Sequence, residues 1–191
     1  MKLQTVSLQD AVLLQKMILN QLDVFTGRVE LLEQGVNSEC GPLCLGIDQE
    51  KRFVVLLSSL HEEDAILVKA LGQLSWVVRH QPLLARLYSQ RGVAPSKTPR
   101  VILISPSFSK AMHEAVAYVD FDLELYQYRV LELNHERVLL FDRILIPGRT
   151  VPSVQSSLPA TAAPPDPSRS VELTEAEKRF FEASSPTDLP A

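Results

Sequence analysis

The chain has 191 residues, of which 46% are apolar and 22% are charged, and its formal net charge is −4. This composition is ordinary for one globular domain with a proper core, and the net charge excludes a general attraction of the whole molecule to polyanions. The longest early apolar run, residues 11–14, is too short for a signal sequence or a membrane span. We therefore expect a soluble, cytoplasmic protein with no membrane partner.

The first third of the chain predicts one helix followed by strands. Ser7 is expected to open the helix, and Gly27 offers its stop. Residues 28–36 are ambiguous between helix and strand, and a strand is preferred because the next segments need a neighbour. The apolar runs 42–47 and 53–58 are joined by a polar turn, which predicts a β-hairpin. The continuous apolarity of the second run indicates a strand buried on both faces.

Helices and strands alternate in the next part of the chain. Glu62, Glu63 and Asp64 crowd together before an apolar-periodic run, where acids suit the positive end of a helix dipole. Pro82 is expected to start a second, short helix. The later elements are a buried strand at 101–105, a helix to about 118, a strand at 121–133 with a bulge at 125–126, and a strand at 137–146. This order predicts an α/β fold with a mixed central sheet flanked by helices, in which the strands at 53–57 and 101–105 are parallel.

The composition changes after residue 146, which divides the chain into three parts. Residues 1–146 are the expected α/β domain. Residues 147–170 hold six prolines and predict a flexible or polyproline-like linker. Residues 171–191 predict a short helix and tail, in which Phe180 and Phe181 are candidates to contact a protein partner or this domain.

Several sequence motifs, taken in order, resemble those of the PD-(D/E)XK nuclease superfamily, in particular its RecB-like and NucS-like endonuclease domains. The stretch "GPLCLGIDQEKRFVVLLSS" resembles the family's aspartate strand, turn and (D/E)-x-K strand, and "ALGQLSW" resembles its Gly-Gln-Leu helix. "VILISPSFSKAMHEAVAYVDFDLELYQYRV" resembles the remaining strand, helix and strand. The resemblance covers residues 9 to about 133 and implies a restriction-endonuclease-like fold with an αβββαβ core.

The family's catalytic residues do not carry over to this sequence. Within an error of one residue, the aspartate position falls on Leu43, and the (D/E)-x-K positions fall on Leu57 and Ser59. Such nucleases hold Mg²⁺ with the two carboxylates, whereas leucine offers no oxygen ligand and serine cannot replace the lysine ammonium. The resemblance therefore implies no catalytic residue, no metal site and no cofactor.

A relocated active site is the alternative. It would combine nearby carboxylates with Lys69, which lies four residues before Gln73 and so on the same side of the predicted helix. Under this alternative alone the protein is a Mg²⁺-dependent DNA endonuclease. Cys40, Cys44 and His61 do not have the paired short spacings of a structural zinc site, and two ordinary thiols are expected.

The charges are unevenly distributed along the chain. Residues 65–113 contain no acidic residue and seven Lys or Arg residues, so the other residues carry −11, the difference between −4 and +7. This basic stretch predicts contact with DNA, RNA or an acidic protein surface. The candidate nucleic-acid-binding residues are Lys69, Gln73, Arg79, Arg86 and Lys110. The prediction is a catalytically inactive nuclease-fold protein that acts as a nucleic-acid- or protein-binding module. The remaining alternative is a purely structural or protein-interaction domain.

Overall fold

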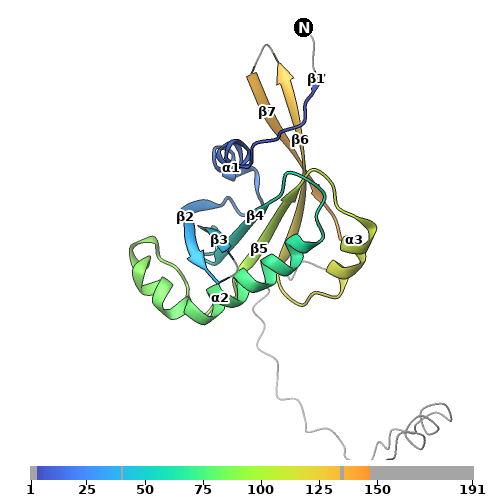
Figure 1. Ribbon diagram of the computed structural model, residues 1–191. Coiled ribbons are helices and arrows are strands. Elements are labelled where there is room, and N and C mark those ends of the chain that lie inside the picture. The colour runs from blue at the N-terminus through green and yellow to red at the C-terminus, as the bar shows by residue number, and fades with distance from the viewer. Residues whose placement is uncertain (1–3, 40, 134–135, 147–191) are drawn as a thin grey trace, which may run out of the picture. The chain divides into compact units, whose positions relative to one another are not determined.

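A seven-stranded mixed sheet forms the centre of the structure in the computed structural model, which describes residues 4–39, 41–133 and 136–146 (Figure 1). The strand order is β1-β6-β5-β4-β3-β2, and β7 also pairs with β6. The strands are β1 (Gln4–Thr5), β2 (Glu30–Ser38), β3 (Gly41–Ile47), β4 (Phe53–Ser58), β5 (Arg100–Ser105), β6 (Leu123–Leu133) and β7 (Glu136–Ile144). The predicted α/β fold with a mixed sheet is confirmed.

The centre of the sheet is parallel and its outer pairs are antiparallel. β4 pairs with β5 in parallel from Val54 opposite Arg100 to Ser58 opposite Ile104, and β5 pairs with β6 in parallel. β3 and β4 form the predicted antiparallel hairpin. The carboxyl ends of β4 and β5 therefore lie side by side, at the edge where open α/β sheets usually bind their ligands.

Helices cover both faces of the sheet, which explains the uninterrupted apolar sequence of β4. On one face Val55 and Leu57 pack in a core with α2 (Ala65–Leu87) and α3 (Lys110–Ala117). On the other face Val54 and Leu56 pack in a second core with α1 (Ala11–Leu19). Phe53 to Leu57 are all buried, as predicted. Two short 3-10 helices complete the described elements, η1 (Leu22–Val24) and η2 (Ser89–Arg91).

α1 begins three residues later than the sequence predicts. Asp10, and not Ser7, is its N-cap, and the Asp10 carboxylate accepts hydrogen bonds from the backbone N–H groups of Val12 and Leu13 at 2.8 and 3.2 Å. A carboxylate satisfies these otherwise unpaired donors and also suits the helix dipole. The prediction that Ser7 opens this helix is therefore wrong.

Two predicted interruptions are absent from the described residues. α2 continues through Pro82, because this proline lies on the solvent-exposed side of the helix, where water can replace the lost backbone partner. β6 pairs with β7 without a register shift through Leu125 and Tyr126. Leu125 and Tyr126 are each buried on a different face of the sheet, at 0% and 3% exposure, which explains why the alternation of apolar and polar residues is broken there. The predicted bulge is therefore wrong.

Residues 1–150 form one compact unit. The predicted linker at 147–170, the predicted terminal helix with Phe180 and Phe181, and Cys40 lie outside the described residues. Among the helices in the described part of the chain, none has the length and apolar composition that crossing a membrane requires.

Candidate functional site

The loop after β4 is tied to its neighbours by hydrogen bonds at the carboxyl edge of the sheet. Ser59 donates its backbone N–H to the carbonyl of Ile104 at 2.9 Å and its hydroxyl to the carbonyl of His61 at 2.7 Å. Tyr128 donates its hydroxyl to the carbonyl of Ser59 at 3.2 Å. The Ser59 hydroxyl is thus bonded to the backbone of its own loop. The N-cap of α2 is a different residue, Asp64.

A small hollow lies at this edge, on the face covered by α1. Its volume of about 20 Å³ has room for about one water molecule. The lining residues are Gln15, Ile18, Leu19, Cys44, Leu56, Leu57, Ser58 and Ile104. This lining contains no carboxylate and no cation, so it offers neither the ligands nor the volume for a hydrated Mg²⁺ ion.

The strand register refines the positions that were aligned with the nuclease motif. Leu43 and Leu57 belong to the core on the α2 face. Cys44 lies directly opposite Leu56 in the β3–β4 ladder, and both belong to the α1 face. A displacement of one residue in either direction places Pro42 or Cys44 at the first position and Leu56 or Ser58 at the second, and none of these is acidic.

Cys44 is the one cysteine whose surroundings the structure describes, and it is buried. Burial raises the pKa of its thiol to about 11, because the apolar surroundings disfavour the thiolate. A thiol that stays protonated at neutral pH is a poor nucleophile and a poor metal ligand.

The acidic residues before α2 are used by local contacts. Glu63 forms an ion pair with Lys69 at 2.7 Å, and the hydrogen bond from Lys69 lowers the pKa of the Glu63 carboxyl. Asp64 accepts a hydrogen bond from Ser109, the N-cap of α3, at 2.6 Å. Within the described ranges there is no group of three or more His, Cys, Asp or Glu side chains that could hold a metal ion.

Lys69 and Gln73 have opposite environments although they are one helical turn apart. The Lys69 side chain is 54% exposed. Gln73 is only 4% exposed, and its side-chain amide donates to the carbonyl of Pro42 at 3.0 Å. Gln73 therefore links α2 to the start of β3. Among the five candidate nucleic-acid-binding residues, only the four cations are exposed.

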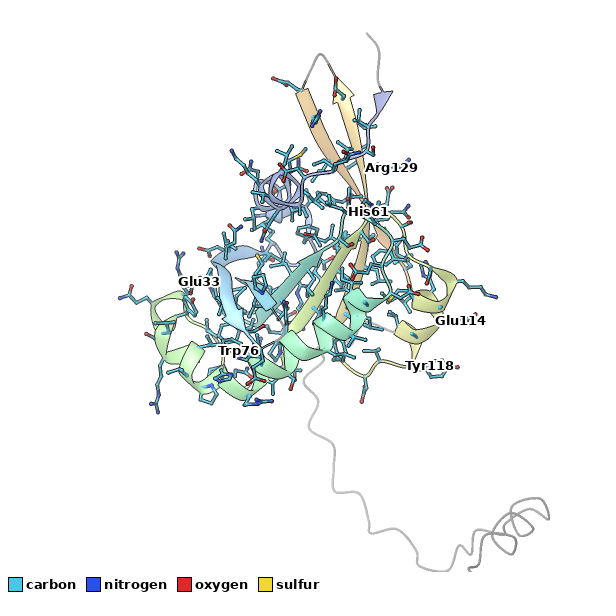
Figure 2. All side chains as sticks on the ribbon, in the orientation of Figure 1. Glu33, His61, Trp76, Glu114, Tyr118 and Arg129 are labelled. Carbon is cyan, nitrogen blue, oxygen red and sulfur yellow. The ribbon has the colours of Figure 1, made fainter. Side chains whose placement is uncertain are left out.

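The four exposed cations form a row rather than a cluster. Lys69, Arg79 and Arg86 lie along α2, and the first and last are separated by about 25 Å at 1.5 Å per helical residue. Lys110 begins α3, whose N-cap is bonded to the residue that precedes α2. In Figure 2, Glu114 of α3 and Trp76 of α2 mark the two helices that carry the row.

Most of these cations have an acidic neighbour. Arg79 pairs with Glu39 and Lys110 pairs with Glu114, each at 3.6 Å, and all of these side chains are exposed. Such exposed pairs stabilise a fold by only about 0–1 kcal/mol, so a phosphate can replace the carboxylate at little cost. Arg86 is exposed too.

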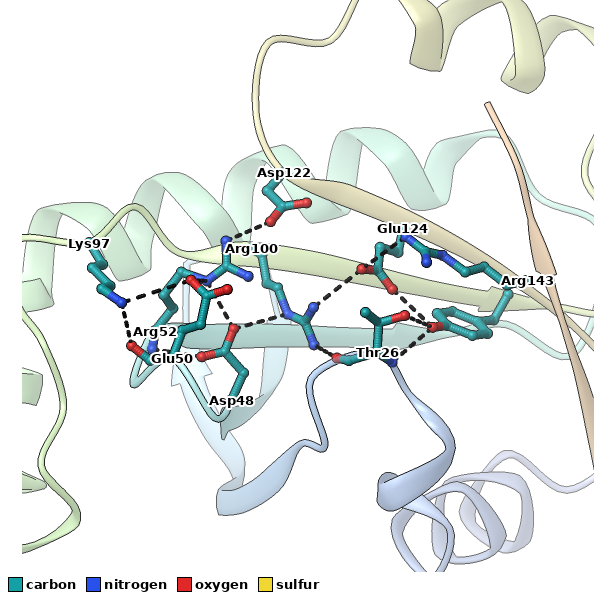
Figure 3. A network of polar contacts seen from close by, with 10 residues as sticks. Thr26, Asp48, Glu50, Arg52, Lys97, Arg100, Asp122, Glu124 and Arg143 are labelled. Atoms are coloured by element: carbon teal, nitrogen blue, oxygen red, sulfur yellow. Dashed lines mark hydrogen bonds and ion pairs between the residues drawn. The ribbon is translucent and has the colours of Figure 1, made fainter. Parts of the chain in front are cut away.

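A buried polar network lies at the opposite edge of the sheet, and the sequence analysis did not find it (Figure 3). The Arg100 side chain is 2% exposed, and its guanidinium lies 3.5 Å from Asp48, lies 3.2 Å from Glu124 and donates to the carbonyl of Thr26. Arg52 adds contacts to Asp48 at 2.9 Å and to Asp122 at 2.7 Å. One signal was available, because Arg100 immediately precedes the apolar strand 101–105 and was therefore a poor candidate for a solvated charge.

Comparisons with known proteins give matches among solved structures only. No family model matches the chain, and no curated protein matches it. The structure of an EndoMS-dsDNA2 complex is 17% identical, covers 65% of this chain and 47% of its own, and has a TM-score of 0.44. A repair endonuclease from Pyrococcus abyssi is 16% identical, with 63% and 48% covered and a TM-score of 0.42. EndoMS in its apo form is 15% identical, with 64% and 48% covered and a TM-score of 0.41. The chain thus spans about half the length of these proteins.

Proposed function

We propose that this protein is a nucleic-acid-binding module that does not carry out metal-dependent cleavage. The observation that supports the proposal is the lining of the hollow at the carboxyl edge of β4, which includes Cys44, Leu56 and Ser58 and contains neither a carboxylate nor a lysine. Chemistry on a phosphodiester needs a metal or an equivalent charge at the reacting atoms, and this lining supplies neither.

Binding is assigned to the row of exposed cations, Lys69, Arg79, Arg86 and Lys110. The row belongs to residues 65–113, which contain no carboxylate, while the rest of the chain is strongly acidic. Contacts of this kind are made to phosphates and not to bases, so the expected binding is sensitive to salt and insensitive to sequence.

A cleavage assay tests the first half of the proposal. The full chain is incubated with Mg²⁺ or Mn²⁺ and with single-stranded, double-stranded and branched DNA, and we expect no products above the background of a mock purification. Cutting that disappears in Lys69→Ala would instead establish the endonuclease with a relocated active site.

A salt titration of DNA and RNA binding tests the second half. We expect affinity to fall steeply with salt, and Lys69→Glu combined with Lys110→Glu to weaken binding and to reduce the slope of log K against log salt by about 2, since about one unit is lost for each phosphate contact. Lys16→Glu on α1 is the control, because it makes the same kind of substitution, with half of the total charge change, on an element outside the row. No binding at low salt would leave only a structural or protein-interaction role.

A further inference from the structure

The outward side of α2 carries a stripe of four apolar residues and one serine that the described residues do not cover. It consists of Val68, Leu71, Ser75, Val78 and Pro82, and we call these five residues the outer stripe. Their spacing is three, four, three and four residues, which is the spacing of a seam that packs against another helix. Val68 is 71% exposed, Leu71 is 43% exposed and Val78 is 48% exposed.

The outer stripe is distinct from the side of α2 that builds the core. The core side consists of Ile66, Ala70, Gln73, Leu74, Val77, Gln81 and Leu84, all of which are buried. α2 is therefore apolar on two opposite sides, whereas a helix that only covers a sheet needs one. Apolar surface that remains in contact with water is stabilised by a partner that covers it.

The charges beside the stripe restrict the chemistry of that partner. Arg79 and Arg86 lie next to the stripe on the helix surface, Lys69 lies nearer the first turn, and α2 contains no carboxylate. A second copy of α2 packed on this side would bring six cations together, with only the exposed Glu39 and Glu63 of each copy as acidic neighbours, and this excess of like charge disfavours self-association. A helix with an apolar seam and flanking carboxylates matches both the seam and the charges.

We propose that the outer stripe of α2 is a docking site for an acidic amphipathic helix of a partner protein. The helix would place its apolar seam on Val68, Leu71 and Val78, and its carboxylates beside Arg79 and Arg86. This mode is a helix packed along a helix, and its specificity comes from the heptad spacing together with the sign of the flanking charges. It shares Arg79 and Arg86 with the proposed nucleic-acid contact, but it also needs the apolar residues, which that contact does not use.

Two synthetic 21-residue helices serve as the probes. The acidic probe has leucine at the a and d positions and glutamate at e and g, which also opposes its pairing with itself, and the basic probe has lysine in place of every glutamate. The full chain is titrated with each probe and followed by fluorescence anisotropy. We expect the acidic probe to bind at least about tenfold more tightly than the basic one, the difference that opposite and like flanking charges produce.

Two variants test whether the acidic probe binds at the outer stripe. Val68→Ser, Leu71→Ser and Val78→Ser together are expected to weaken the acidic probe at least about tenfold. Val12→Ser is the matched control, since Val12 is 75% exposed on α1 and should leave binding unchanged. The triple variant should retain its salt-sensitive DNA affinity, which separates this result from a failure of the nucleic-acid proposal.

Four outcomes would overturn the docking proposal. They are equal binding of the two probes, binding that the triple variant retains, concentration-dependent self-association that the triple variant abolishes, and binding to anionic lipid vesicles that exceeds binding to the acidic probe. A chain shortened to residues 1–150 provides one more arm, provided that it unfolds cooperatively. If only the shortened chain binds the acidic probe, residues 151–191 occupy the site, and the proposal of a separate partner is wrong.

Discussion

The amino and carboxyl ends of the parallel β4–β5 pair differ in their charged side chains. At the amino end, Arg100 is buried with Asp48 and Glu124 in a network of hydrogen bonds and ion pairs. At the carboxyl end, Leu57 is buried and Ser58 is exposed. Open α/β sheets usually bind ligands at the carboxyl end. Here the concentrated charge lies at the other end, where its partners are within the protein itself.

The comparison shows that a dense group of charges is not by itself evidence of a reactive site. The Arg100 guanidinium is neutralised by carboxylates from β6 and from the turn between β3 and β4, so it ties together segments that are far apart in sequence. We interpret the amino end as structural. The carboxyl end is stabilised by apolar packing, and the exposed cations of α2 are the residues that we propose for binding.

The largest expected effect comes from removing the centre of the buried network. Arg100→Met should lower the free energy of unfolding by about 3–5 kcal/mol, because it removes the buried cation that Asp48 and Glu124 share and leaves each carboxylate with one partly exposed arginine, Arg52 or Arg143. Urea denaturation measures the change. Adding Asp48→Asn and Glu124→Gln to this variant should restore part of the stability, and a single variant as stable as the natural protein would show that the network is not the anchor we describe.

At the carboxyl end the expected effect depends on packing. Leu57→Ala should cost about 2–4 kcal/mol, because Leu57 is 9% exposed and its removal leaves a cavity in the core beneath α2. Ser58→Ala is the adjacent control and should change the free energy of unfolding by less than about 0.5 kcal/mol. If the serine variant were the more damaging of the two, a polar role at this edge would have to be reconsidered.

Cys44 should make the protein less stable at alkaline pH. Its pKa is raised to about 11 in the folded protein from 9.0, so the unfolded chain releases the thiol proton first. The stabilising contribution is complete below pH 9 and is lost as the pH rises toward 11, by about 2 kcal/mol. Unfolding of the natural protein and of Cys44→Ala, compared across this range, isolates the contribution. Parallel pH profiles for the two proteins would contradict the assignment.

The smallest expected effect concerns an exposed ion pair. Lys69→Met should change the free energy of unfolding by less than about 1 kcal/mol, since the Lys69 and Glu63 side chains are 54% and 40% exposed. The same variant should let the pKa of Glu63 rise toward its ordinary value, which a carbon-detected NMR titration of the carboxyl group measures. A loss of unfolding free energy comparable to that of Arg100→Met would show that this exposed ion pair stabilises the fold as much as the buried network does.

The sequence predicts the frame of the molecule well because apolar runs report burial directly. The β3–β4 hairpin, the parallel β4–β5 pair and the burial of residues 53–57 all follow from short apolar segments and their connections. The helix break at Pro82 was predicted wrongly, because sequence alone does not show that this position faces water.

The candidate site was harder to predict, because the distance between two residues in the sequence does not show in which direction each side chain points. Lys69 and Gln73 are one turn apart, yet one side chain meets solvent and the other meets Pro42. Likewise, the basic stretch includes Arg100, which is buried and forms ion pairs with internal carboxylates. Separating such residues requires knowledge of the strands that surround them, and these come from distant parts of the chain.

The pairing of β1 with β6 has a consequence for the order of folding. Gln4 and Thr5 pair with Glu132 and Leu131, so this contact closes a loop that spans most of the domain. Long loops are entropically costly to close, and β6 must already be positioned before two residues can join it. We therefore expect Gln4 and Thr5 to be among the last of the described residues to dock and among the first to detach, so that the closing contact of the sheet is also its weakest.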